Sequence, residues 1–280
     1  MVISTRQPRL EETAIVTGSG RGVGRAIALE LANAGAAVAL AARSGSALED
    51  VRAAIADGGG RTIAVPTDVT NASEVAAMVA EVGRTLGAPT LLVNNAGSWG
   101  SVGPVVDSDP ETWWHDVEVS LKGSFLCTRA TLPTMLRQGR GRIVNVASYA
   151  AITPNPYMTA YACAKAAVLR FTDSLSAELE GSGVRAFCIT PGFVRTQMVE
   201  RAGGSEAGRY YLPKLRTRSD ALEPKRAGRL VVDIASGRLD ALAGRFLHVL
   251  DDPEQLLESA ERIRAEGLYQ LRLDTLTPEP

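Results

Sequence analysis

The sequence has few cysteines, few histidines and almost no net charge. Its 280 residues include three cysteines and two histidines, and the formal net charge is −1. The cysteines (Cys127, Cys163 and Cys188) are far apart, odd in number and set in apolar surroundings, which favours reduced thiols over a disulfide framework. Neither His115 nor His248 has ligand-like spacing around it, so we expect no metal site.

Signals for a membrane or for nucleic acid are also missing. No apolar run approaches the roughly 18 residues that cross a bilayer. The first residues, MVISTRQPRLEETAIVTG, lack the apolar core of a signal peptide. The balanced charge gives no reason to expect nucleic acid or an anionic membrane as a partner. We therefore expect a small-molecule partner and, by default, a cytoplasmic location.

Short β-branched runs alternate with longer alanine- and leucine-rich segments along most of the chain. The runs that resemble buried strands are Ala14–Thr17, Ala37–Ala41, Thr62–Val65, Leu91–Asn94, Ile143–Ala147 and Val184–Thr190. The expected helices between them are Gly22–Asn33, Ala47–Ala56, Ala72–Leu86, Glu111–Arg137 and Ala160–Glu180. This alternation predicts an α/β fold, a Rossmann-type doubly wound parallel sheet in a three-layer α/β/α arrangement.

The chain shows no internal repeat and no long linker, so the sequence predicts a single domain over residues 1–280. The expected core covers residues 13–196 and 226–250 and includes a final strand at Gly244–Val249. Residues 197–225 carry arginines, lysines and the Tyr210-Tyr211 pair without a clean period. We expect an irregular or helical lid over a site there. A C-terminal extension, about 253–280, includes an amphipathic helix at Glu254–Glu266.

The first strand leads directly into a glycine-rich turn, TGSGRGVG at Thr17–Gly24, and then into a helix. Glycine lets the backbone come close to a pyrophosphate, and the amino end of a helix offers N–H groups and a positive dipole. The spacing is T-G-x-x-x-G-x-G, which differs from the common G-x-G-x-x-G dinucleotide fingerprint. Its place after the first strand of an α/β pattern predicts a dinucleotide phosphate site.

Several further motifs follow the glycine turn in a fixed order. They are Asp68-Val69, Asn94-Asn95-Ala96-Gly97, Ser148, Tyr161-x-x-x-Lys165, and Pro191-Gly192 with Thr196. In this order and at these intervals, they resemble the motifs of the short-chain dehydrogenase/reductase family over residues 13–196. The resemblance implies an oxidoreductase that interconverts a carbonyl and a secondary alcohol by hydride transfer with NAD(P). It also implies a homodimer or homotetramer.

The resemblance implies a set of cofactor-binding residues as well. They are Gly18, Ser19, Gly20, Arg21, Gly22, Val23, Gly24, Arg43, Asp68, Val69, Asn95, Ala96, Gly97, Tyr161, Lys165, Pro191, Gly192, Val194 and Thr196. Ala42, at the end of the second strand, stands where NAD-binding relatives usually place an aspartate. Arg43 and Arg21 offer two guanidiniums and no carboxylate there, which favours NADP(H) over NAD(H).

Tyr161 and Lys165 are four residues apart and therefore point from one helix face. The resemblance makes Tyr161 the general acid/base, and its pKa, about 10 when unperturbed, must then fall toward neutrality. A cation about 5 Å away contributes about 3 kcal/mol at an effective dielectric of about 20, so Lys165 is expected to supply most of that shift. Ser148, at the end of a strand, is expected to donate a hydrogen bond to the substrate oxygen.

One position departs from the family pattern. Relatives usually carry an asparagine in the helix after the fourth strand, which helps to order a water that connects the lysine to solvent. The corresponding stretch here is Val119-Ser120-Leu121-Lys122-Gly123. Ser120 has a hydroxyl but less reach and fewer hydrogen-bonding groups than asparagine. We expect the relay to run through an extra water or through Ser120 itself, or to be impaired.

Four aromatic residues are expected to border the substrate and would suit a ring or a hydrophobic chain. They are Trp99, Tyr157, Phe193 and Tyr210. An equally open interpretation places some of them in the core or in a subunit interface. Other functions also remain open: an NAD(H)-dependent dehydrogenase of the same family, an epimerase or dehydratase, or a cofactor-sensing protein without turnover. The last of these would expect Tyr161 or Lys165 to be lost, and both are present.

Overall fold

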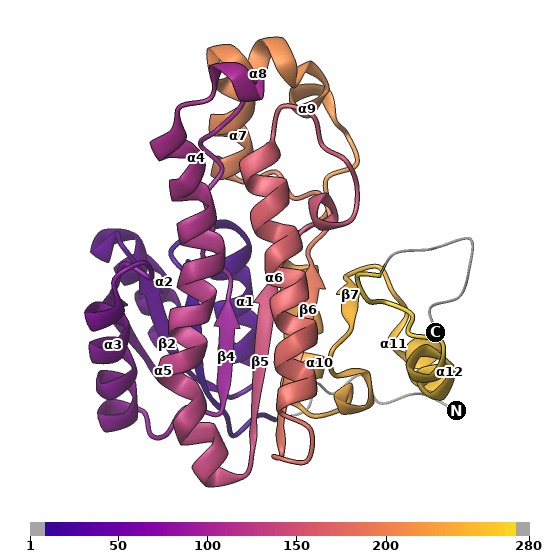
Figure 1. The fold of residues 1–280 in the computed structure, drawn as a ribbon. Coiled ribbons are helices and arrows are strands. Elements are labelled where there is room, and N and C mark those ends of the chain that lie inside the picture. The colour runs from indigo at the N-terminus through magenta and orange to yellow at the C-terminus, as the bar shows by residue number, and fades with distance from the viewer. Residues whose placement is uncertain (1–8, 273–280) are drawn as a thin grey trace.

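A seven-stranded parallel sheet forms the centre of the computed structural model, which describes residues 9–272. Its strands are β1 (Thr13–Thr17), β2 (Ala37–Ala42), β3 (Thr62–Pro66), β4 (Leu91–Asn94), β5 (Gly141–Val146), β6 (Val184–Thr190) and β7 (Phe246–His248). They lie in the order β3-β2-β1-β4-β5-β6-β7, and every neighbouring pair is parallel (Figure 1). The predicted doubly wound α/β fold is confirmed.

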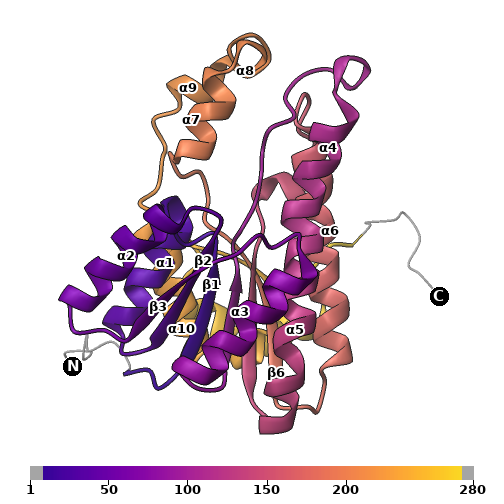
Figure 2. The ribbon, with the colours of Figure 1, turned by 90° about the vertical axis from the view of Figure 1, so that its left-hand side faces the viewer.

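Helices cover both faces of this sheet, because successive strand residues point to opposite sides. One face carries α1 (Gly22–Asn33), α2 (Gly45–Asp57) and α10 (Lys225–Ala235), and the other carries α3 (Ala72–Thr85), α5 (Gly123–Gln138) and α6 (Thr159–Glu178) (Figure 2). In β1, Val16 belongs to the apolar cluster that includes Ile27 of α1. Its neighbour Ile15 belongs to the cluster that includes Met78 of α3. Burial on both faces explains why the strands are continuously apolar in sequence.

The helical stretch after β4 is continuous from Pro110 to Gln138, in agreement with the helix predicted over Glu111–Arg137, but it contains a π-helical turn that was not predicted. The structure has α4 (Pro110–Val117), a π-helical turn, η2 (Glu118–Lys122), and then α5. A π-turn changes the hydrogen-bond partner from i+4 to i+5 without needing a glycine or a proline, so the sequence pattern does not reveal it. Such turns are frequent at functional sites, and this one contains Ser120.

The segment after β6 is helical. It forms α7 (Gln197–Gly204), α8 (Glu206–Tyr211) and α9 (Pro213–Thr217), which stand above the carboxyl edge of the sheet (Figures 1 and 2). The next helix, α10, is absent from the helices expected from the sequence. Its buried residues Ala227, Leu230, Val231 and Ile234 nevertheless follow the i, i+3, i+4, i+7 spacing of an amphipathic helix.

The C-terminal segment folds back along the last strand. β7 is shorter than the predicted Gly244–Val249, and the backbone N–H of Phe246 donates to the carbonyl oxygen of Tyr269 at 2.8 Å. The helix predicted at Glu254–Glu266 is interrupted at Ser259, which separates α11 (Pro253–Glu258) from α12 (Ala260–Ala265). Residues 273–280 of the predicted extension lie outside the described residues.

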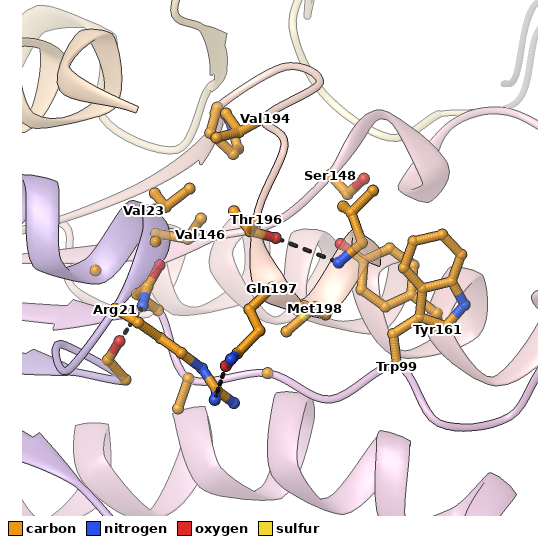
Figure 3. Close-up of a pocket in the computed structure, with 18 of the residues that line it drawn as sticks. Arg21, Val23, Trp99, Val146, Ser148, Tyr161, Val194, Thr196, Gln197 and Met198 are labelled. Carbon is orange, nitrogen blue, oxygen red and sulfur yellow. Dashed lines mark hydrogen bonds between the residues drawn. The ribbon is translucent and has the colours of Figure 1, made fainter. Parts of the chain in front are cut away.

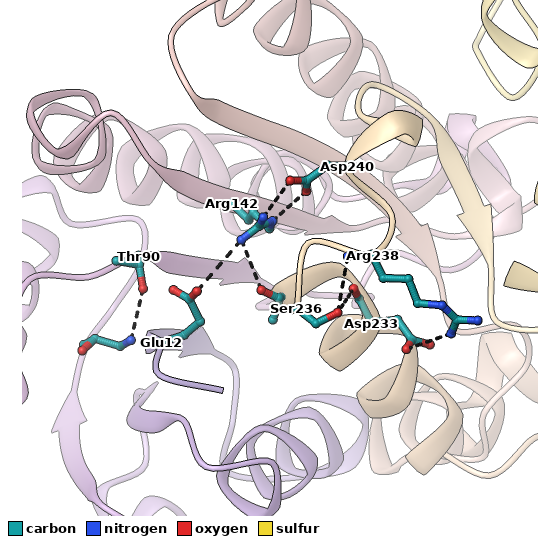
Figure 4. Close-up of polar contacts among 9 residues, drawn as sticks. Glu12, Thr90, Arg142, Asp233, Ser236, Arg238 and Asp240 are labelled. Atoms are coloured by element: carbon teal, nitrogen blue, oxygen red, sulfur yellow. Dashed lines mark hydrogen bonds and ion pairs between the residues drawn. The ribbon is translucent and has the colours of Figure 1, made fainter. Parts of the chain in front are cut away.

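Arg142 joins three parts of the chain at the amino edge of the sheet (Figure 4). It lies in β5, and its guanidinium donates two hydrogen bonds of 2.7 Å to the carboxylate of Asp240. The carboxylate of Glu12, just before β1, lies 4.0 Å from the same guanidinium. This network lies at the edge opposite the strand ends that carry the predicted site.

Two observations bear on the classes of protein considered above. Within residues 9–272, no helix is long and apolar enough to cross a membrane. In the same range, no group of three or more His, Cys, Asp or Glu side chains could hold a metal ion.

All three cysteines are free thiols. Cys127 and Cys188 are buried, whereas Cys163 is exposed on α6, contrary to its expected apolar surroundings.

Candidate active site

A cavity of about 800 Å³ lies at the carboxyl ends of the strands. β1 and β4 are neighbours beneath it, at the point where the strand order reverses, and open α/β sheets bind ligands at this place. The predicted site residues that line it are Gly18, Gly20, Arg21, Gly22, Val23, Gly24, Arg43, Asp68, Val69, Asn95, Ala96, Gly97, Trp99, Ser148, Tyr161, Lys165, Pro191, Gly192, Phe193, Val194 and Thr196 (Figure 3). Ser19, Ser120, Tyr157 and Tyr210 are not among its lining residues.

The glycine turn needs glycine for conformational and steric reasons. Gly18 and Gly22 have φ values of 64° and 56°, in the left-handed region that side chains rarely adopt. A Cβ on Gly24 would lie 2.3 Å from the carbonyl oxygen of Gly18. The missing side chain lets the first turn of α1 pack against the loop. Ser19 points away from the cavity, because it is fully buried and its hydroxyl lies 3.5 Å from the carbonyl oxygen of Ala41.

The loop after β4 is fastened to this turn by Thr17. The Thr17 hydroxyl accepts hydrogen bonds of 3.0 Å from the backbone N–H groups of Asn95 and Ala96. The side-chain amide of Asn95 donates to the carbonyl oxygens of Thr17, at 2.9 Å, and Gly18, at 3.3 Å. Asn95 therefore holds the two loops that form the floor of the cavity.

Three guanidiniums gather at one end of the cavity. Arg21 and Arg43 were predicted to do so, and Arg201 of α7 also lines the cavity there. Burial and the positive charges of Arg201 and Arg43 lower the pKa of Arg21. Arg21 donates a hydrogen bond to the side-chain carbonyl oxygen of Gln197, which joins the glycine turn to α7 (Figure 3). A group of guanidiniums beside a glycine-rich helix start fits the phosphates of a dinucleotide.

Asp68, near the same end, has local partners. Its Oδ1 accepts hydrogen bonds from the backbone N–H of Thr70, at 2.9 Å, and from the Thr70 hydroxyl, at 2.8 Å. The backbone hydrogen bond from Thr70 is the main cause of the lowered pKa of Asp68, and the charge of Arg43 adds to it. Val69 beside it is buried.

Tyr161, Ser148 and Lys165 come together at the other end of the cavity. Ser148 and Tyr161 both line this end, where the Ser148 side chain favours a lower pKa of Tyr161, and the ammonium of Lys165 lies 5.8 Å from the centroid of the Tyr161 ring. Lys165 is buried and donates to the carbonyl oxygen of Val146 at 2.8 Å. Burial lowers the pKa of Lys165 to about 8.

Lys165 was expected to supply most of the fall in the pKa of Tyr161, with the positive nicotinamide supplying the rest; in the protein without the dinucleotide this pKa is raised. Burial raises the pKa of Tyr161, and the nearby Ser148 side chain opposes this only in part. The cause is the partial burial of the phenol, because hydration stabilises the charged phenolate more than the neutral phenol and burial removes that hydration. Part of the burial comes from the indole of Trp99, which stacks on the Tyr161 ring with centroids 5.2 Å apart and planes 25° apart (Figure 3).

The other predicted substrate residues divide into two groups. Phe193 lines the cavity, and the guanidinium of Arg218 lies 4.0 Å from its ring centroid. Tyr210 is 77% exposed on α8. Tyr157 packs on the ring of Tyr211, with centroids 4.6 Å apart. The structure thus brings Trp99 and Phe193 to the cavity and leaves both tyrosines outside it.

Ser120 lies close behind the cavity wall without lining it. It is buried in the π-helical turn, and its hydroxyl has no hydrogen-bond partner within the described residues. A Cβ built on Gly97 would lie 3.5 Å from the Lys165 ammonium and 3.6 Å from the Ser120 hydroxyl. Both groups therefore border the same small space beside Gly97. The backbone carbonyl of Ser120 accepts a 2.7 Å hydrogen bond from the Ser124 hydroxyl.

Several lining residues were not expected from the sequence. They include Met158, Gln197, Met198, Arg201, Leu215, Arg218 and His248. Gln197 and Arg201 follow Thr196 and are four residues apart, so a helix over this segment would have placed them on one face. The position of His248 depends on β7 lying next to β6, which no local motif reveals.

Comparisons with known proteins agree with this geometry. A family model described as short chain dehydrogenase matches residues 12–206. A short chain dehydrogenase from Pseudocercospora fijiensis is 35% identical over 279 residues, which cover 95% of this chain and 90% of the relative. A 3-oxoacyl-[acyl-carrier-protein] reductase from Synechocystis is 38% identical over 68% of this chain and 76% of its own.

A similar fold has been solved with a dinucleotide. The crystal structure of a putative NAD(P)-dependent gluconate 5-dehydrogenase from Beutenbergia cavernae, with bound NADP, matches with a TM-score of 0.78 at 30% identity. The match covers 89% of this chain and 98% of that one. A short-chain type dehydrogenase/reductase from Mycobacterium marinum matches with a TM-score of 0.79 at 30% identity, over 86% and 94% of the two chains.

Proposed function

Because the chain belongs to the short-chain dehydrogenase family, whose members are oxidoreductases acting on CH–OH groups, we propose that it interconverts a carbonyl and a secondary alcohol with NADP(H). In this proposal Tyr161 is the general acid/base, assisted by Lys165 and Ser148. The observation that carries it is the position of these three side chains. They lie close together at one end of the cavity, and the guanidiniums of Arg21, Arg43 and Arg201 lie at the other end. A hydride-transfer reaction needs one proton donor at the substrate oxygen, and this group supplies it.

The chain's own residues handle the proton. In the reductive direction the Tyr161 hydroxyl gives its proton to the substrate oxygen, to which Ser148 donates a hydrogen bond. The phenolate that remains is stabilised by the Lys165 ammonium, which lies 5.8 Å from the centre of the ring. A cation about 5 Å from a phenolate contributes about 3 kcal/mol at an effective dielectric of about 20. When bound, the nicotinamide supplies the hydride in reduction and accepts it in oxidation, where its positive charge also favours the phenolate. In oxidation the phenolate takes up the proton.

The preference for NADP(H) rests on charge. Ala42 offers no carboxylate at the end of β2, and Arg43 and Arg21 line the cavity there. A dianionic 2′-phosphate forms strong charge-assisted bonds with guanidiniums, whereas a ribose hydroxyl would need an acceptor. Gly18, Gly22 and Gly24 would hold the pyrophosphate against the start of α1, and Pro191, Gly192 and Thr196 would border the nicotinamide end.

The substrate side of the cavity favours an apolar or ring-bearing ketone. Trp99, Phe193 and Met158 line it, and all three present carbon-rich surfaces.

We further propose a homodimer or homotetramer in the cytoplasm. Phe125 and Leu136, both exposed on α5, are apolar side chains that a partner subunit would cover. Light scattering coupled to gel filtration tests the assembly.

The reaction is tested by NADPH consumption on a panel of ketones that includes quinones and cyclic ketones. We expect net oxidation of NADPH with at least one apolar ketone, and formation of the matching secondary alcohol. Conversion of a substrate into a different product without net NADPH consumption would indicate an epimerase or dehydratase instead. NADPH binding without turnover of any panel member, in either direction, would contradict the proposal.

A further inference from the structure

Asp116 is a buried carboxylate that has no role in the proposed chemistry. It lies in the last turn of α4 and is fully buried. The backbone N–H of Gly100 donates to both of its oxygens at 2.9 Å, and the N–H of Ser101 donates to Oδ2 at 2.9 Å. All of these donors are backbone groups of the loop that follows β4. Because a buried carboxylate is costly unless it is hydrogen-bonded, Asp116 and this loop fix one another.

The residue before this anchor is Trp99. Its indole stacks on the Tyr161 ring, yet its own N–H is buried and has no hydrogen-bond partner within the described residues. No polar contact of the indole therefore fixes its place. The backbone on which it stands must do so, and the nearest fixed point on its carboxyl side is the Gly100 N–H held by Asp116.

The same helix also holds the other partner of the stack. The indole N–H of Trp113, in α4, donates to the Thr159 hydroxyl at 3.0 Å. Thr159 is the first residue of α6, two residues before Tyr161. One helix therefore holds the Trp99 loop through Asp116 and the start of α6 through Trp113, so its position determines how the two rings meet.

We propose that Asp116 is a positioning residue: it holds Trp99 against Tyr161 and thereby orients the phenol toward the substrate, an inference that rests on the proposed function. The Tyr161 ring must present its hydroxyl to the substrate oxygen within hydrogen-bond reach. A displacement of about 1 Å in a reacting group can cost on the order of 100-fold in rate. Loss of the anchor should therefore slow the chemical step without weakening the binding of the dinucleotide.

Asp116→Asn tests this with little change in volume. In either orientation the new NH2 group takes the place of an oxygen that accepts from the Gly100 N–H at 2.9 Å, and this contact between two donors weakens the anchor. We express kcat relative to the concentration of protein that binds NADPH, so that misfolded protein is not counted. This kcat should fall about tenfold, while the dissociation constant of NADPH stays within about twofold. The matched control is Asp109→Asn, the same charge loss on the same helix. Asp109 caps α4 by accepting from the Thr112 N–H, and asparagine caps equally well. The control should keep wild-type kcat.

A double-mutant cycle with Trp99→Leu separates positioning from a purely structural role. If Asp116 acts through Trp99, Asp116→Asn lowers kcat in the native background and has no further effect once Trp99 is replaced. Equal losses of kcat in both backgrounds would overturn the proposal. The proposal would also be overturned if Asp116→Asn lowered the Tm but left the kcat of the NADPH-binding protein unchanged, because a purely structural role gives that result.

A second readout does not depend on turnover. Protein labelled with 5-fluorotryptophan gives three ¹⁹F resonances, one for each tryptophan, and the signal lost in Trp99→Leu identifies Trp99. We expect the Trp99 resonance to move in Asp116→Asn and to stay in place in Asp109→Asn. If the wild-type protein reduced no ketone, the proposed function would fail, and this resonance would still report on the anchor. An unmoved resonance would overturn the inference.

Gly100→Ala serves if Asp116→Asn does not fold. The added Cβ would lie 3.2 Å from Thr112 Cγ2, so the loop and α4 must separate by a few tenths of an ångström, and it would lie in ordinary contact with Asp116 Oδ1, at 3.5 Å. We expect the Trp99 resonance to move and kcat to fall several-fold, with NADPH binding retained. A wild-type resonance and a wild-type kcat in this variant would contradict the proposal.

Discussion

The ammonium of Lys165 lies 5.8 Å from the centroid of the Tyr161 ring; Lys165 is buried, and Tyr161 is partly buried at the cavity. Burial acts on the two groups in opposite directions. It lowers the pKa of Lys165 to about 8 and raises that of Tyr161, so each group is moved toward its neutral form. The attraction between the ammonium and a phenolate opposes both shifts. The charged pair is therefore available to catalysis, although the unliganded protein does not favour it.

The shifted pKa of Lys165 predicts a pH-dependent stability. Between pH 8 and the ordinary lysine value of 10.5, the unfolded chain keeps a proton that the folded chain has lost. The free energy of unfolding contributed by Lys165 therefore rises with pH across this window and is constant below it. Urea unfolding of the wild type and of Lys165→Met measures this, because other titrating groups cancel in the difference. The difference should rise from pH 8 to pH 10, and a constant difference would contradict the lowered pKa of Lys165.

The guanidiniums at the end of β2 predict which cofactor is used. Arg43→Ala should lower kcat/KM for NADPH about 10- to 100-fold, since hydrogen bonds to charged groups contribute about 1.5–3 kcal/mol. The value for NADH should change about threefold or less, because NADH has no 2′-phosphate. Arg229→Ala, an exposed arginine of α10 outside the cavity lining, is the control. Equal losses with both cofactors would place Arg43 away from the 2′-phosphate.

The Ser120 hydroxyl predicts an effect on proton transfer. It borders the same space as the Lys165 ammonium beside Gly97 and has no protein partner within residues 9–272. If it carries part of the relay, Ser120→Ala should lower kcat about tenfold and shift the pH profile, while Ser120→Asn should retain or raise kcat. Ser124→Ala is the control, because that buried hydroxyl is already bound to the Ser120 carbonyl. Unchanged rates and pH profiles in both Ser120 variants would make this departure from the family pattern neutral.

Local patterns predicted the elements whose causes are local. β4 and β6 occupy the expected residues, because continuous apolar runs mark strands buried on both faces. The four-residue spacing of Tyr161 and Lys165 is likewise local, and the helix places both side chains toward the cavity. The π-helical turn around Ser120 could not be predicted, because no residue type marks a change of hydrogen-bond partner from i+4 to i+5.

Contacts between distant segments account for the remaining differences. Trp99 stacks on Tyr161 because a carboxylate 17 residues along the chain from Trp99, Asp116, holds its loop, and no spacing rule connects these positions. Arg201 reaches the cavity only because α7 folds over the glycine turn, where Gln197 meets Arg21. Tyr157 is four residues before Tyr161 in sequence, yet it packs on Tyr211. Its proximity to Tyr161 in sequence therefore did not predict whether the Tyr157 side chain points into the cavity.

The most direct test of this account is the turnover of Tyr161→Phe with saturating NADPH and a ketone that the wild-type protein reduces. Removing the hydroxyl takes away the proton donor and leaves the rest of the cavity in place. A general acid contributes about 10²- to 10⁴-fold, so kcat should fall by at least about 100-fold while NADPH still binds. Tyr210→Phe, on the exposed side of α8, should keep wild-type turnover. If Tyr161→Phe retained more than about a tenth of the wild-type kcat, Tyr161 would not be the general acid/base.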